Sequence, residues 1–494
     1  MTVRELIPSL APIEAEGNLD REVTGIAYDS RKVRPGELFV ALRGQHTDGH
    51  NFLEVAIERG AAAVIIERNG IPTRRAAKIK VEDSRKALAR AAAQFYGNPA
   101  SRLKLIGVTG TNGKTTVTFL LKKILEESGT RTGLIGTVAY VIGERQIPAA
   151  RTTPEALELQ SMMAQMLRAG CGACAMEVSS HALDQHRVHG IDFDVAVFTN
   201  LTQDHLDYHG DMDRYFAAKT TLFHSLGAGS KQGCAVINLD DERGKALFDD
   251  ARVRAKKITY GIVEAADVRA TNVRMSSSGT EFTVDSPVGR TSVRTPLIGR
   301  HNIYNSLAAL AVAFGLGIDL KRAASALGKF DRVPGRLDKV AGTGAFHVFI
   351  DYAHTDDALL NVLTTLRELA QGKLIVVFGC GGNRDAGKRP KMGRVAERLA
   401  DFIVLTSDNP RKEDPREILR QIEAGFSDPA KYEVVVDRRE AIGRALARAK
   451  RNDIVLIAGK GHEAYQEFSD TIVPFDDKVV VQELLAAGTK SGGN

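Results

Sequence analysis

Residues 110–116, which read Gly-Thr-Asn-Gly-Lys-Thr-Thr, have the composition of a loop that binds phosphate groups. Glycines allow backbone N–H groups to approach an anion closely, and the N-terminus of a following helix adds partial positive charge. Lys114 could reach the outer phosphates of a nucleotide, and the hydroxyl of Thr115 could bind Mg²⁺. Our first hypothesis is therefore that the chain binds a nucleoside triphosphate.

The match to the strict P-loop pattern is a shortened variant, because Val108 stands where the pattern has a glycine. An ordinary turn between a strand and a helix is the alternative interpretation. An apolar run at 103–108 predicts a buried strand before the loop, and apolar residues on one face of 117–125 predict a helix after it. This context favours the phosphate-binding interpretation, because the motif requires a strand before it and a helix after it.

The strand before the loop belongs to a repeating pattern of strands and helices. Further strands are predicted at 133–138, 173–178, 195–199 and 235–239, with helical stretches between them. Such alternation predicts a mainly parallel sheet covered on both faces. Ligands of these sheets gather beyond the carboxyl ends of the strands, which is where the loop lies.

Polar side chains follow two of the predicted strands at this edge. Glu177 is a candidate Mg²⁺ ligand, because hard cations take carboxylate and phosphate oxygens together. His205, with Asp204 and Asp207 nearby, could hold a second metal, although satisfied polar residues at strand ends are the alternative. Lys219 lies among apolar neighbours in a predicted helix, where a lysine usually extends to water. A functional lysine is the other interpretation.

Two further α/β units flank this central one, so the predicted domains are 1–99, 100–334 and 335–494. The first has polar loops at 28–31 and 43–49, which suit either a ligand or solvated turns. Alternating residues at 251–294 predict antiparallel hairpins within the central domain. The third domain carries polar, glycine-containing loops after its strands, with charges of both signs that suit a zwitterion. A dinucleotide site is disfavoured, because no G-x-G-x-x-G opens a helix there.

Composition limits the class of protein. The 494 residues are 43% hydrophobic and 26% charged, which is typical of a soluble globular protein of several domains. The net charge is +6, but basic residues are spread along the chain and Trp is absent, so nucleic acid is not an expected partner. We predict no membrane association and a cytoplasmic location. The four cysteines, including the pair Cys171 and Cys174, are expected to be buried free thiols.

The motifs taken together resemble those of a known family. Residues 110–116, 177–181, 199–209, 299–302 and 351–354 are similar, in the same order, to the motif set of the Mur ligases. The resemblance covers nearly the whole chain. It implies three α/β domains, with a central P-loop sheet and a Rossmann-like, doubly wound C-terminal domain. It also implies an ATP-dependent ligase of peptidoglycan synthesis that joins an acid to an amino acid.

The resemblance implies a role for each matching position. The nucleotide positions are Gly110, Thr111, Asn112, Gly113, Lys114, Thr115, Thr116, Asn302, Arg336 and Asp351. The catalytic positions are Lys114, Glu177, His205 and Lys219, and the metal positions are Thr115, Glu177, His205 and Lys219, the last as a carbamate. The positions for the UDP-sugar dipeptide are Ser30, Gln45, His46, Thr47, Thr152, Thr153, Ser179, Gln185 and Arg187. The amino-acid positions are Arg384, Asp408, Asn409, Pro410, Arg411, Gly459 and Glu463.

Residues 408–411 resemble the specificity motif of the family member that adds meso-diaminopimelate. The implied substrates are that amino acid and UDP-N-acetylmuramoyl-L-alanyl-D-glutamate, and the implied cofactors are ATP, Mg²⁺ and a carbamylated Lys219. We expect a monomer that acts on small molecules. One departure from the family pattern is Asp356, where proline is usual. The rival hypotheses are a folylpolyglutamate synthase and a nucleotide-dependent regulatory switch.

Overall fold

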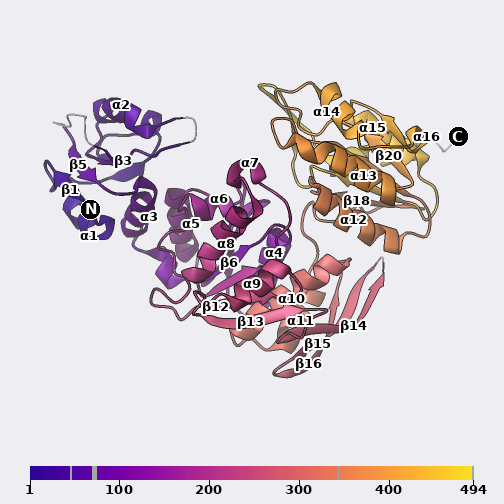
Figure 1. The fold of residues 1–494 in the computed structure, drawn as a ribbon, viewed down its shortest axis with the longest axis horizontal. Coiled ribbons are helices and arrows are strands. Elements are labelled where there is room, and N and C mark those ends of the chain that lie inside the picture. Colours follow the sequence, from indigo (N-terminus) through magenta and orange to yellow (C-terminus); the bar gives the residue numbers. More distant parts are fainter. Residues whose placement is uncertain (45–46, 69–74, 277, 343, 492–494) are drawn as a thin grey trace.

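The computed structural model describes residues 1–44, 47–68, 75–276, 278–342 and 344–491. Three α/β domains follow one another along the chain, and the first and third stand above opposite ends of the central one (Figure 1). Gln45 and His46, which the family resemblance assigns to the UDP-sugar, lie outside the described residues. Within the described ranges, no helix is long and apolar enough to cross a membrane.

The described part of the N-terminal domain forms a five-stranded sheet in the order β1-β5-β4-β3-β2. Its strands are β1 (Glu14–Glu16), β2 (Gly25–Ala27), β3 (Glu37–Val40), β4 (Ala63–Ile66) and β5 (Ala77–Lys80), and its helices are α1 (Val3–Leu10), α2 (Leu53–Glu58) and α3 (Ser84–Phe95). Neighbouring strands are parallel except for β1 and β5. The side chain of Asp83 caps α3 by accepting from the N–H groups of Arg85 and Lys86, as is favourable at a helix N-terminus.

The central domain has an eleven-stranded sheet in the order β16-β15-β14-β13-β12-β11-β6-β10-β7-β8-β9, counted over the described residues. The strands are β6 (Lys104–Thr109), β7 (Thr132–Ile135), β8 (Ala139–Ile142), β9 (Arg145–Pro148), β10 (Ala173–Glu177), β11 (Val195–Phe198), β12 (Cys234–Asn238), β13 (Lys256–Gly261), β14 (Val268–Ser276), β15 (Gly279–Ser286) and β16 (Gly289–Thr295). The helices are α4 (Lys114–Glu127), α5 (Ala156–Arg168), α6 (Ser180–Asp184), α7 (Leu206–His209), α8 (Met212–His224), α9 (Glu242–Asp249), α10 (Arg300–Gly315) and α11 (Leu320–Gly328).

This sheet is mixed but mainly parallel, as the sequence predicts, because six of its ten neighbouring strand pairs in the described residues are parallel. Its middle strands are parallel, and the predicted hairpins are the antiparallel strands β14, β15 and β16 at one end. The antiparallel pair β8 and β9 at the other end is not predicted by the sequence. The strand expected at 133–138 ends at Ile135, because the backbone N–H of Thr137 turns to donate to Glu177 at 2.8 Å.

The helix that follows the phosphate-loop motif packs as its sequence predicts. Val117, Leu120, Leu121, Ile124 and Leu125 are each at most 2% exposed and belong to one cluster with the middle strands and α10. Burial of such side chains contributes about 1.5–3 kcal/mol each. The N-terminus of α4 is therefore fixed at the carboxyl edge of β6.

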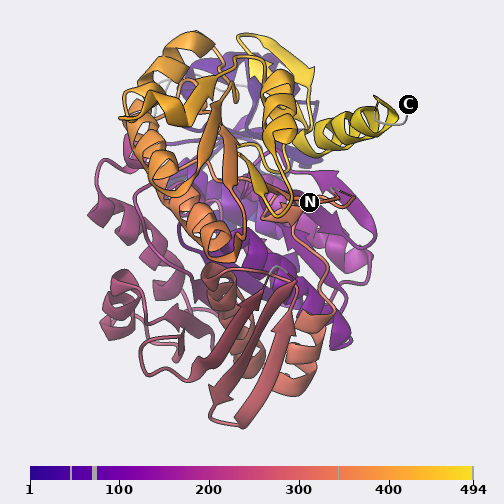
Figure 2. The same ribbon diagram turned by 90° about the vertical axis from the view of Figure 1, so that its right-hand side faces the viewer.

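The third domain has a six-stranded sheet in the order β17-β18-β22-β19-β20-β21 within the described ranges, and a separate hairpin of β23 and β24. Its strands are β17 (Asp338–Lys339), β18 (His347–Asp351), β19 (Leu374–Phe378), β20 (Phe402–Leu405), β21 (Tyr432–Val434), β22 (Ile454–Ala458), β23 (Tyr465–Phe468) and β24 (Thr471–Pro474). The helices are α12 (Asp356–Leu369), α13 (Arg389–Leu399), α14 (Pro415–Glu423), α15 (Arg438–Arg448) and α16 (Asp477–Ser491). Figure 2 shows this domain, in orange and yellow, above the central hairpins, with α16 projecting to one side.

Asp356 takes the place of the usual proline without disturbing the local fold. It is the first residue of α12, and Thr355 caps that helix by accepting from the N–H of Ala358. Proline suits this position because the first helical N–H has no partner within the helix. Aspartate suits it too, because its charge is favourable at the positive end of the helix dipole.

The link between the central and third domains runs over residues 329–337, between α11 and β17. We expect the third domain to swing about residues 333–336 when ligands bind, because closure would exclude water from a site shared by both domains. Small-angle scattering with a non-hydrolysable ATP analogue and both implied substrates should give a smaller radius of gyration than the free protein. An unchanged radius would contradict the swing.

Candidate active site

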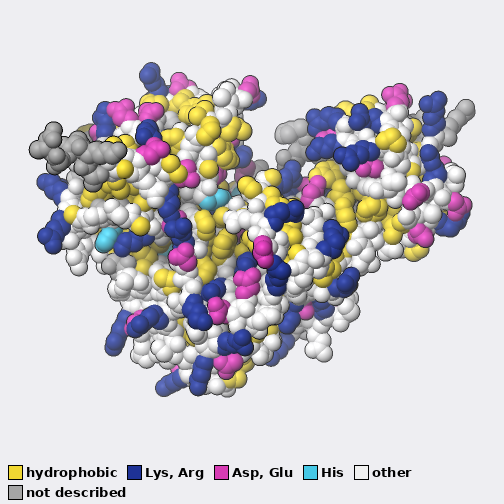
Figure 3. All heavy atoms as spheres, turned by 180° about the vertical axis from the view of Figure 1, so that it is seen from behind, with side chains coloured by type: hydrophobic (Ala, Val, Ile, Leu, Met, Phe, Trp, Pro, Cys, Tyr) yellow, Lys and Arg dark blue, Asp and Glu magenta, His cyan; other side chains and the backbone are white. Residues whose placement is uncertain are grey.

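A cavity of about 520 Å³ lies where the central and third domains meet. The predicted site residues that line it are Thr111, Asn112, Gly113, Lys114, Thr115, Thr116, Thr152, Glu177, Ser179, His205, Asn302, Arg336 and Asp351. Figure 3, a view from behind, shows the molecular surface hollowed between the two outer domains, with acidic and basic side chains interspersed over that face. The structure thus brings the loop motif and both strand-end clusters to one cavity.

The loop itself depends on two glycines with positive φ. Gly110 has φ of 137°, and a Cβ there would lie 1.9 Å from Thr199 Oγ1. Gly113 has φ of 88°, and a Cβ there would lie 2.3 Å from Asn305 Oδ1. Any other residue at either position would be strained and would also clash. The loop therefore packs directly against neighbouring polar side chains.

Two lysines meet at the carbonyl of Gly110. Lys114 Nζ donates to the Gly110 oxygen at 3.0 Å and to the Thr111 oxygen at 2.8 Å. Lys219 Nζ, from α8, donates to the same Gly110 oxygen at 2.8 Å and lies over the Tyr215 ring. Lys219 is only 1% exposed, so it does not extend to water as most helical lysines do.

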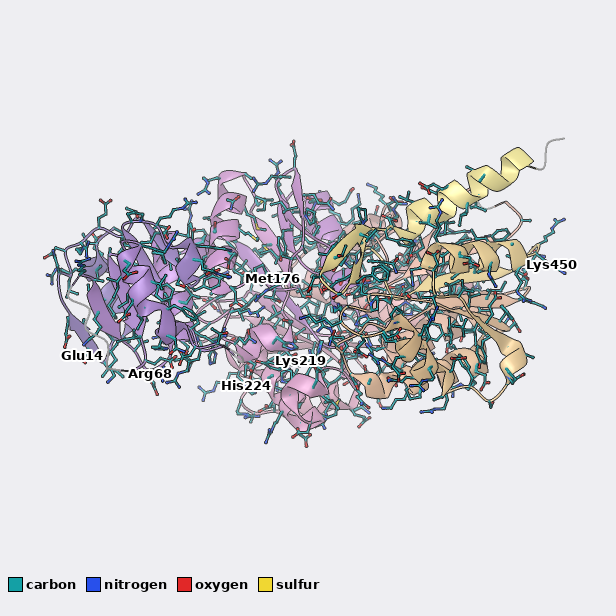
Figure 4. All side chains as sticks on the ribbon, turned by 90° about the horizontal axis from the view of Figure 1, so that it is seen from above. Glu14, Arg68, Met176, Lys219, His224 and Lys450 are labelled. Carbon is teal, nitrogen blue, oxygen red and sulfur yellow. The ribbon has the colours of Figure 1, made fainter. Side chains whose placement is uncertain are left out.

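Burial lowers the pKa of the Lys219 amine well below its usual value, and the positive charge of Lys114 lowers it further. Burial also lowers the pKa of Lys114, although the carboxylates of Glu177 and Asp204 oppose that shift. Figure 4 places Lys219 in the middle of the molecule, between the domain that carries Glu14 and Arg68 and the domain that carries Lys450. A buried neutral amine is a nucleophile, which makes Lys219 a candidate for covalent modification.

Three of the four predicted metal ligands, Thr115, Glu177 and His205, line the cavity, whereas Lys219 is not among its lining residues. Glu177 is 1% exposed, and its carboxylate accepts from the N–H and the hydroxyl of Thr137 at 2.8 and 3.1 Å. His205 is 43% exposed, and its Nε2 lies 3.4 Å from the carboxylate of Asp204. Over the described ranges, no group of three or more His, Cys, Asp or Glu residues is arranged to hold a metal ion. Within the described residues Asp204, His205 and Asp207 are thus not such a group, and metal binding by His205 together with other ligands stays a prediction.

Asn302 and Asp351 are both engaged with protein groups. Asn302 Nδ2 donates to the Ile298 carbonyl at 2.8 Å, and its Oδ1 accepts from Asn305 at 2.9 Å. Asp351 accepts from the backbone N–H groups of Leu337 and Ala353 at 2.6 and 2.8 Å. Burial raises the pKa of Asp351, although nearby Arg336 opposes the shift. These two side chains therefore form part of the cavity wall, and a ligand could use only the hydrogen-bonding sites that their protein partners leave open.

Sequence reasoning missed the residue that joins the third domain to the loop. Asp357, in the first turn of α12, accepts from Asn112 Nδ2 at 2.7 Å and from the Thr202 hydroxyl at 3.0 Å. Arg336 makes a second link, because its Nη2 donates to the Thr115 hydroxyl at 3.4 Å. Asp357 follows the 351–354 motif by three residues, so extending the motif into the predicted helix would have found it.

A second group, here named the third-domain cluster, consists of the predicted residues Asp408, Asn409, Arg411, Gly459 and Glu463 together with Lys460, which the sequence did not single out. Lys460 Nζ donates to Asn409 Oδ1 at 3.0 Å and to Glu463 Oε2 at 3.2 Å. One carboxylate oxygen of Asp408 is buried with no hydrogen-bond partner among the described residues. Gly459 leaves room beside that oxygen, since a Cβ there would lie 2.4 Å from it.

The Tyr352 hydroxyl, which lines the cavity, donates to Glu463 at 3.4 Å and joins the third-domain cluster to the cavity.

Arg411 has a positive φ of 51°, which is uncommon for a residue with a side chain and often marks a functional position. Its Nε donates to Glu467 at 2.9 Å, and its Nη1 donates to the Gly382 carbonyl at 2.9 Å. Arg384 lies nearby, against Gly381.

The residues assigned to the UDP-sugar dipeptide are divided between two domains. Arg187 donates to the Thr153 carbonyl at 2.8 Å and to Gln185 Oε1 at 2.7 Å, and the N–H of Ser179 donates to the Thr153 hydroxyl. Ser30 and Thr47 belong to the N-terminal domain and do not line the cavity described above. Of the described members of this set, Thr152 and Ser179 line the cavity, and Ser30 and Thr47 do not.

Comparison with known proteins gives matches over all three domains. The family models that match are the Mur ligase family catalytic domain at 22–96, the Mur ligase middle domain at 108–313 and the Mur ligase glutamate ligase domain at 335–461. The UDP-N-acetylmuramoyl-L-alanyl-D-glutamate–2,6-diaminopimelate ligase of Syntrophomonas wolfei is 46% identical over 99% of this chain and 100% of its own length.

The chain belongs to the Mur ligase family. A solved structure of a ligase of the same name has a TM-score of 0.70 at 36% identity and covers 99% of both chains. The MurF ligase of Thermotoga maritima, solved in complex with ADP, has a TM-score of 0.64 at 20% identity and covers 96% of this chain and 99% of its own. The predicted family, enzyme class and three-domain α/β fold are confirmed.

The cavity of this Mur ligase fits a nucleotide with a bound Mg²⁺ rather than a metal ion alone. Mg²⁺ is usually held by one or two protein groups together with phosphate oxygens and water. Glu177 and the Thr115 hydroxyl line the same cavity and provide such groups.

We expect Gly113→Ala to abolish nucleotide binding by this Mur ligase, because the new Cβ would clash with Asn305 and distort the loop. Gly129→Ala is the matched control: Gly129 follows the other end of α4 with φ of 91°, and a Cβ there meets nothing within 4 Å. Both variants place a side chain at a similar positive φ. In a thermal shift assay, ADP should raise the melting temperature of the native protein and of Gly129→Ala, but not that of Gly113→Ala. Equal increases in all three proteins would contradict the role of the loop in nucleotide binding.

Proposed function

We propose that this Mur ligase uses ATP to join meso-diaminopimelate to the γ-carboxylate of D-glutamate in UDP-N-acetylmuramoyl-L-alanyl-D-glutamate. The observation that carries the proposal is the third-domain cluster, which presents two carboxylates, the Lys460 amine and the Arg411 guanidinium beside the P-loop cavity. A zwitterionic amino acid needs groups of both signs. The 46% identical relative from Syntrophomonas wolfei, whose name states this activity, supports the same assignment.

The reaction would proceed in two steps, phosphoryl transfer to the acid and then amide formation. The γ-carboxylate oxygen attacks the γ-phosphorus of ATP, which forms an acyl phosphate and releases ADP. The amine nitrogen then attacks the acyl carbon, and the carbon–oxygen bond to phosphate breaks as an amide forms and the amine loses a proton. Positioning and charge neutralisation provide most of the catalysis in such phosphoryl transfer.

The residues of the cavity have defined parts in this scheme. Lys114 neutralises charge on the transferred phosphoryl group, and the N-terminus of α4 holds the phosphates through backbone N–H groups. Thr115, Glu177, His205 and carbamylated Lys219 would hold Mg²⁺, which supplies charge neutralisation at the phosphates when bound. We further propose that Asn302, Arg336 and Asp351 support the rest of the nucleotide. The enzyme works on these small molecules as a cytoplasmic monomer.

Arg411 would account for a preference for diaminopimelate through the N–H groups that Glu467 and the Gly382 carbonyl leave open. A guanidinium makes paired hydrogen bonds to a carboxylate, and diaminopimelate carries a second carboxylate where lysine has only an ammonium group. Lysine would bring a cation to Arg411. A folylpolyglutamate synthase would not need this motif, and a regulatory switch would not need an amine site.

We expect phosphate release only when ATP, UDP-N-acetylmuramoyl-L-alanyl-D-glutamate and meso-diaminopimelate are all present. L-Lysine in place of diaminopimelate should give far less release, because Arg411 would face a cation instead of a carboxylate. A coupled phosphate assay with each component omitted in turn measures this. Equal rates with both amines would refute the specificity, and release without any amine would favour the switch.

We expect Lys219→Met to lower the rate by about two orders of magnitude or more, as loss of an electrostatic catalytic group does. Lys321→Met, at an exposed position on α11, is the control and should leave the rate unchanged. The native protein in ¹³C-bicarbonate should give a carbamate signal by NMR, absent in Lys219→Met. Because only the neutral amine reacts with CO₂, the signal should decline as pH falls. A native protein without the signal would refute the modification.

A further inference from the structure

One ion pair in the third domain is completely buried. Arg438 begins α15, Asp477 begins α16, and both side chains are 0% exposed. Arg438 Nε and Nη2 donate to the two carboxylate oxygens of Asp477, each at 2.8 Å. This paired geometry is the strongest form of such a contact.

The same guanidinium also holds two loops of the third-domain cluster. Arg438 Nη1 donates to the Ser407 carbonyl at 3.3 Å, and Nη2 donates to the Ala458 carbonyl at 3.1 Å. Ser407 immediately precedes Asp408, and Ala458 immediately precedes Gly459. The planar guanidinium of Arg438 therefore fixes the distance between the loop after β20 and the loop after β22.

A third element is tied to the same place. Gln466, a buried residue of β23, donates from Nε2 to the Asp408 carbonyl at 2.9 Å. Its neighbour Glu467 donates from its backbone N–H to Asn409 Oδ1 at 3.0 Å and pairs with Arg411 through its side chain. The hairpin and the Arg438 fork thus hold the 407–411 loop from two directions.

Helix stability does not account for Arg438. A cation in the first turn of a helix opposes the helix dipole, and burying an ion pair costs desolvation energy that its attraction often fails to offset. Burial works to lower the pKa of Arg438, but Asp477, with Asp408 and Glu463 farther off, raises it overall, so the guanidinium stays charged. The electrostatic influence of Arg438 on Asp408 and Glu463, together with its contacts to the two loops, explains its burial better than helix stability does.

We infer that Arg438 is a positioning residue for the amine substrate, setting the distance between Asp408 on one loop and Gly459 and Glu463 on the other. This inference rests on the proposed function, because it takes the third-domain cluster to be the amine site. Arg438 itself is fully buried and touches no substrate. It acts through the two carbonyls, and Asp477 holds its fork in the required orientation.

A neighbouring ion pair provides a matched control. Arg439 and Glu483 join the same two helices with their side chains 2.6 Å apart, but they are about half exposed and contact neither loop. A pair that only ties α15 to α16 would behave like this one. Arg439→Gln and Glu483→Gln should leave every kinetic constant unchanged.

The decisive variant is the double change Arg438→Met with Asp477→Leu. Replacing a buried ion pair with apolar residues of similar volume often preserves stability, so the melting temperature should stay near that of the native protein. The Ala458 carbonyl loses its Arg438 donor and the Ser407 carbonyl keeps, within the described residues, only Gln466 Nε2, at 3.5 Å, so the two loops lose the side chain that joins them. We expect the KM for diaminopimelate to rise about tenfold or more, while the KM values for ATP and the UDP-linked substrate stay the same.

Arg438→Lys is the second variant, in case the double variant does not fold. It keeps the positive charge but lacks the planar fork, so it should also raise the KM for the amine selectively. An unchanged KM for diaminopimelate in a folded variant overturns the inference while the proposed function stands. If the native enzyme shows no amine-dependent phosphate release, the proposed function is refuted, and the inference that rests on it is refuted too.

Discussion

The carbonyl oxygen of Gly110 is the point on which the active site depends. It accepts from both Lys114 and Lys219, so two amines from different helices converge on one atom. Neighbouring amines repel each other when both are charged, and burial of Lys219 opposes its charge further. The arrangement concentrates positive potential where phosphate groups arrive and leaves one amine able to stay neutral. A side chain at position 110 would block it, because Thr199 packs against the glycine.

The domains are arranged around this point by a small number of polar links. Asp357 reaches from α12 to Asn112 in the loop, and Arg336 reaches from the connecting segment to the Thr115 hydroxyl. Tyr352 connects the cavity to Glu463 in the third-domain cluster. Phosphate-binding groups and amine-binding groups therefore lie on separate domains, and the third domain contacts the loop through side chains of only moderate burial. That is the arrangement expected of domains that move during turnover.

Much of the fold could be predicted from the sequence, because its signals are local. Strands such as β19 and β20 are continuous apolar runs, and α3 is bounded by a capping aspartate, so their limits follow from the residues alone. The antiparallel pair β8 and β9 was missed, because it forms where Thr137 turns toward Glu177, which is distant in sequence. Mutual contacts of this kind leave no periodic pattern.

The site likewise divides into residues that local sequence patterns identify and residues whose roles depend on contacts with distant parts of the chain. The P-loop variant and the polar strand ends identified the cavity lining, since parallel strands bring their carboxyl ends together. Asp357, Thr137 and Arg438 were not identified, because their roles depend on which residues they meet across domains or between loops. Arg411 was identified, but its ion pair with Glu467 was not, since the hairpin that carries Glu467 lies more than fifty residues later in the chain.

The third-domain cluster lies entirely on loops that follow β20 and β22, whereas the phosphate-binding groups lie on the central domain. If the cluster is the amine site, as we propose, choice of amine and activation of the acid are encoded in separate segments of the gene. Substitutions in the third domain would then change the amine without altering the groups that activate the acid. The same architecture could accept a transplanted third domain, provided that the incoming α12 keeps the aspartate that meets Asn112. Evolution could diversify a set of such enzymes by recombination as well as by point mutation.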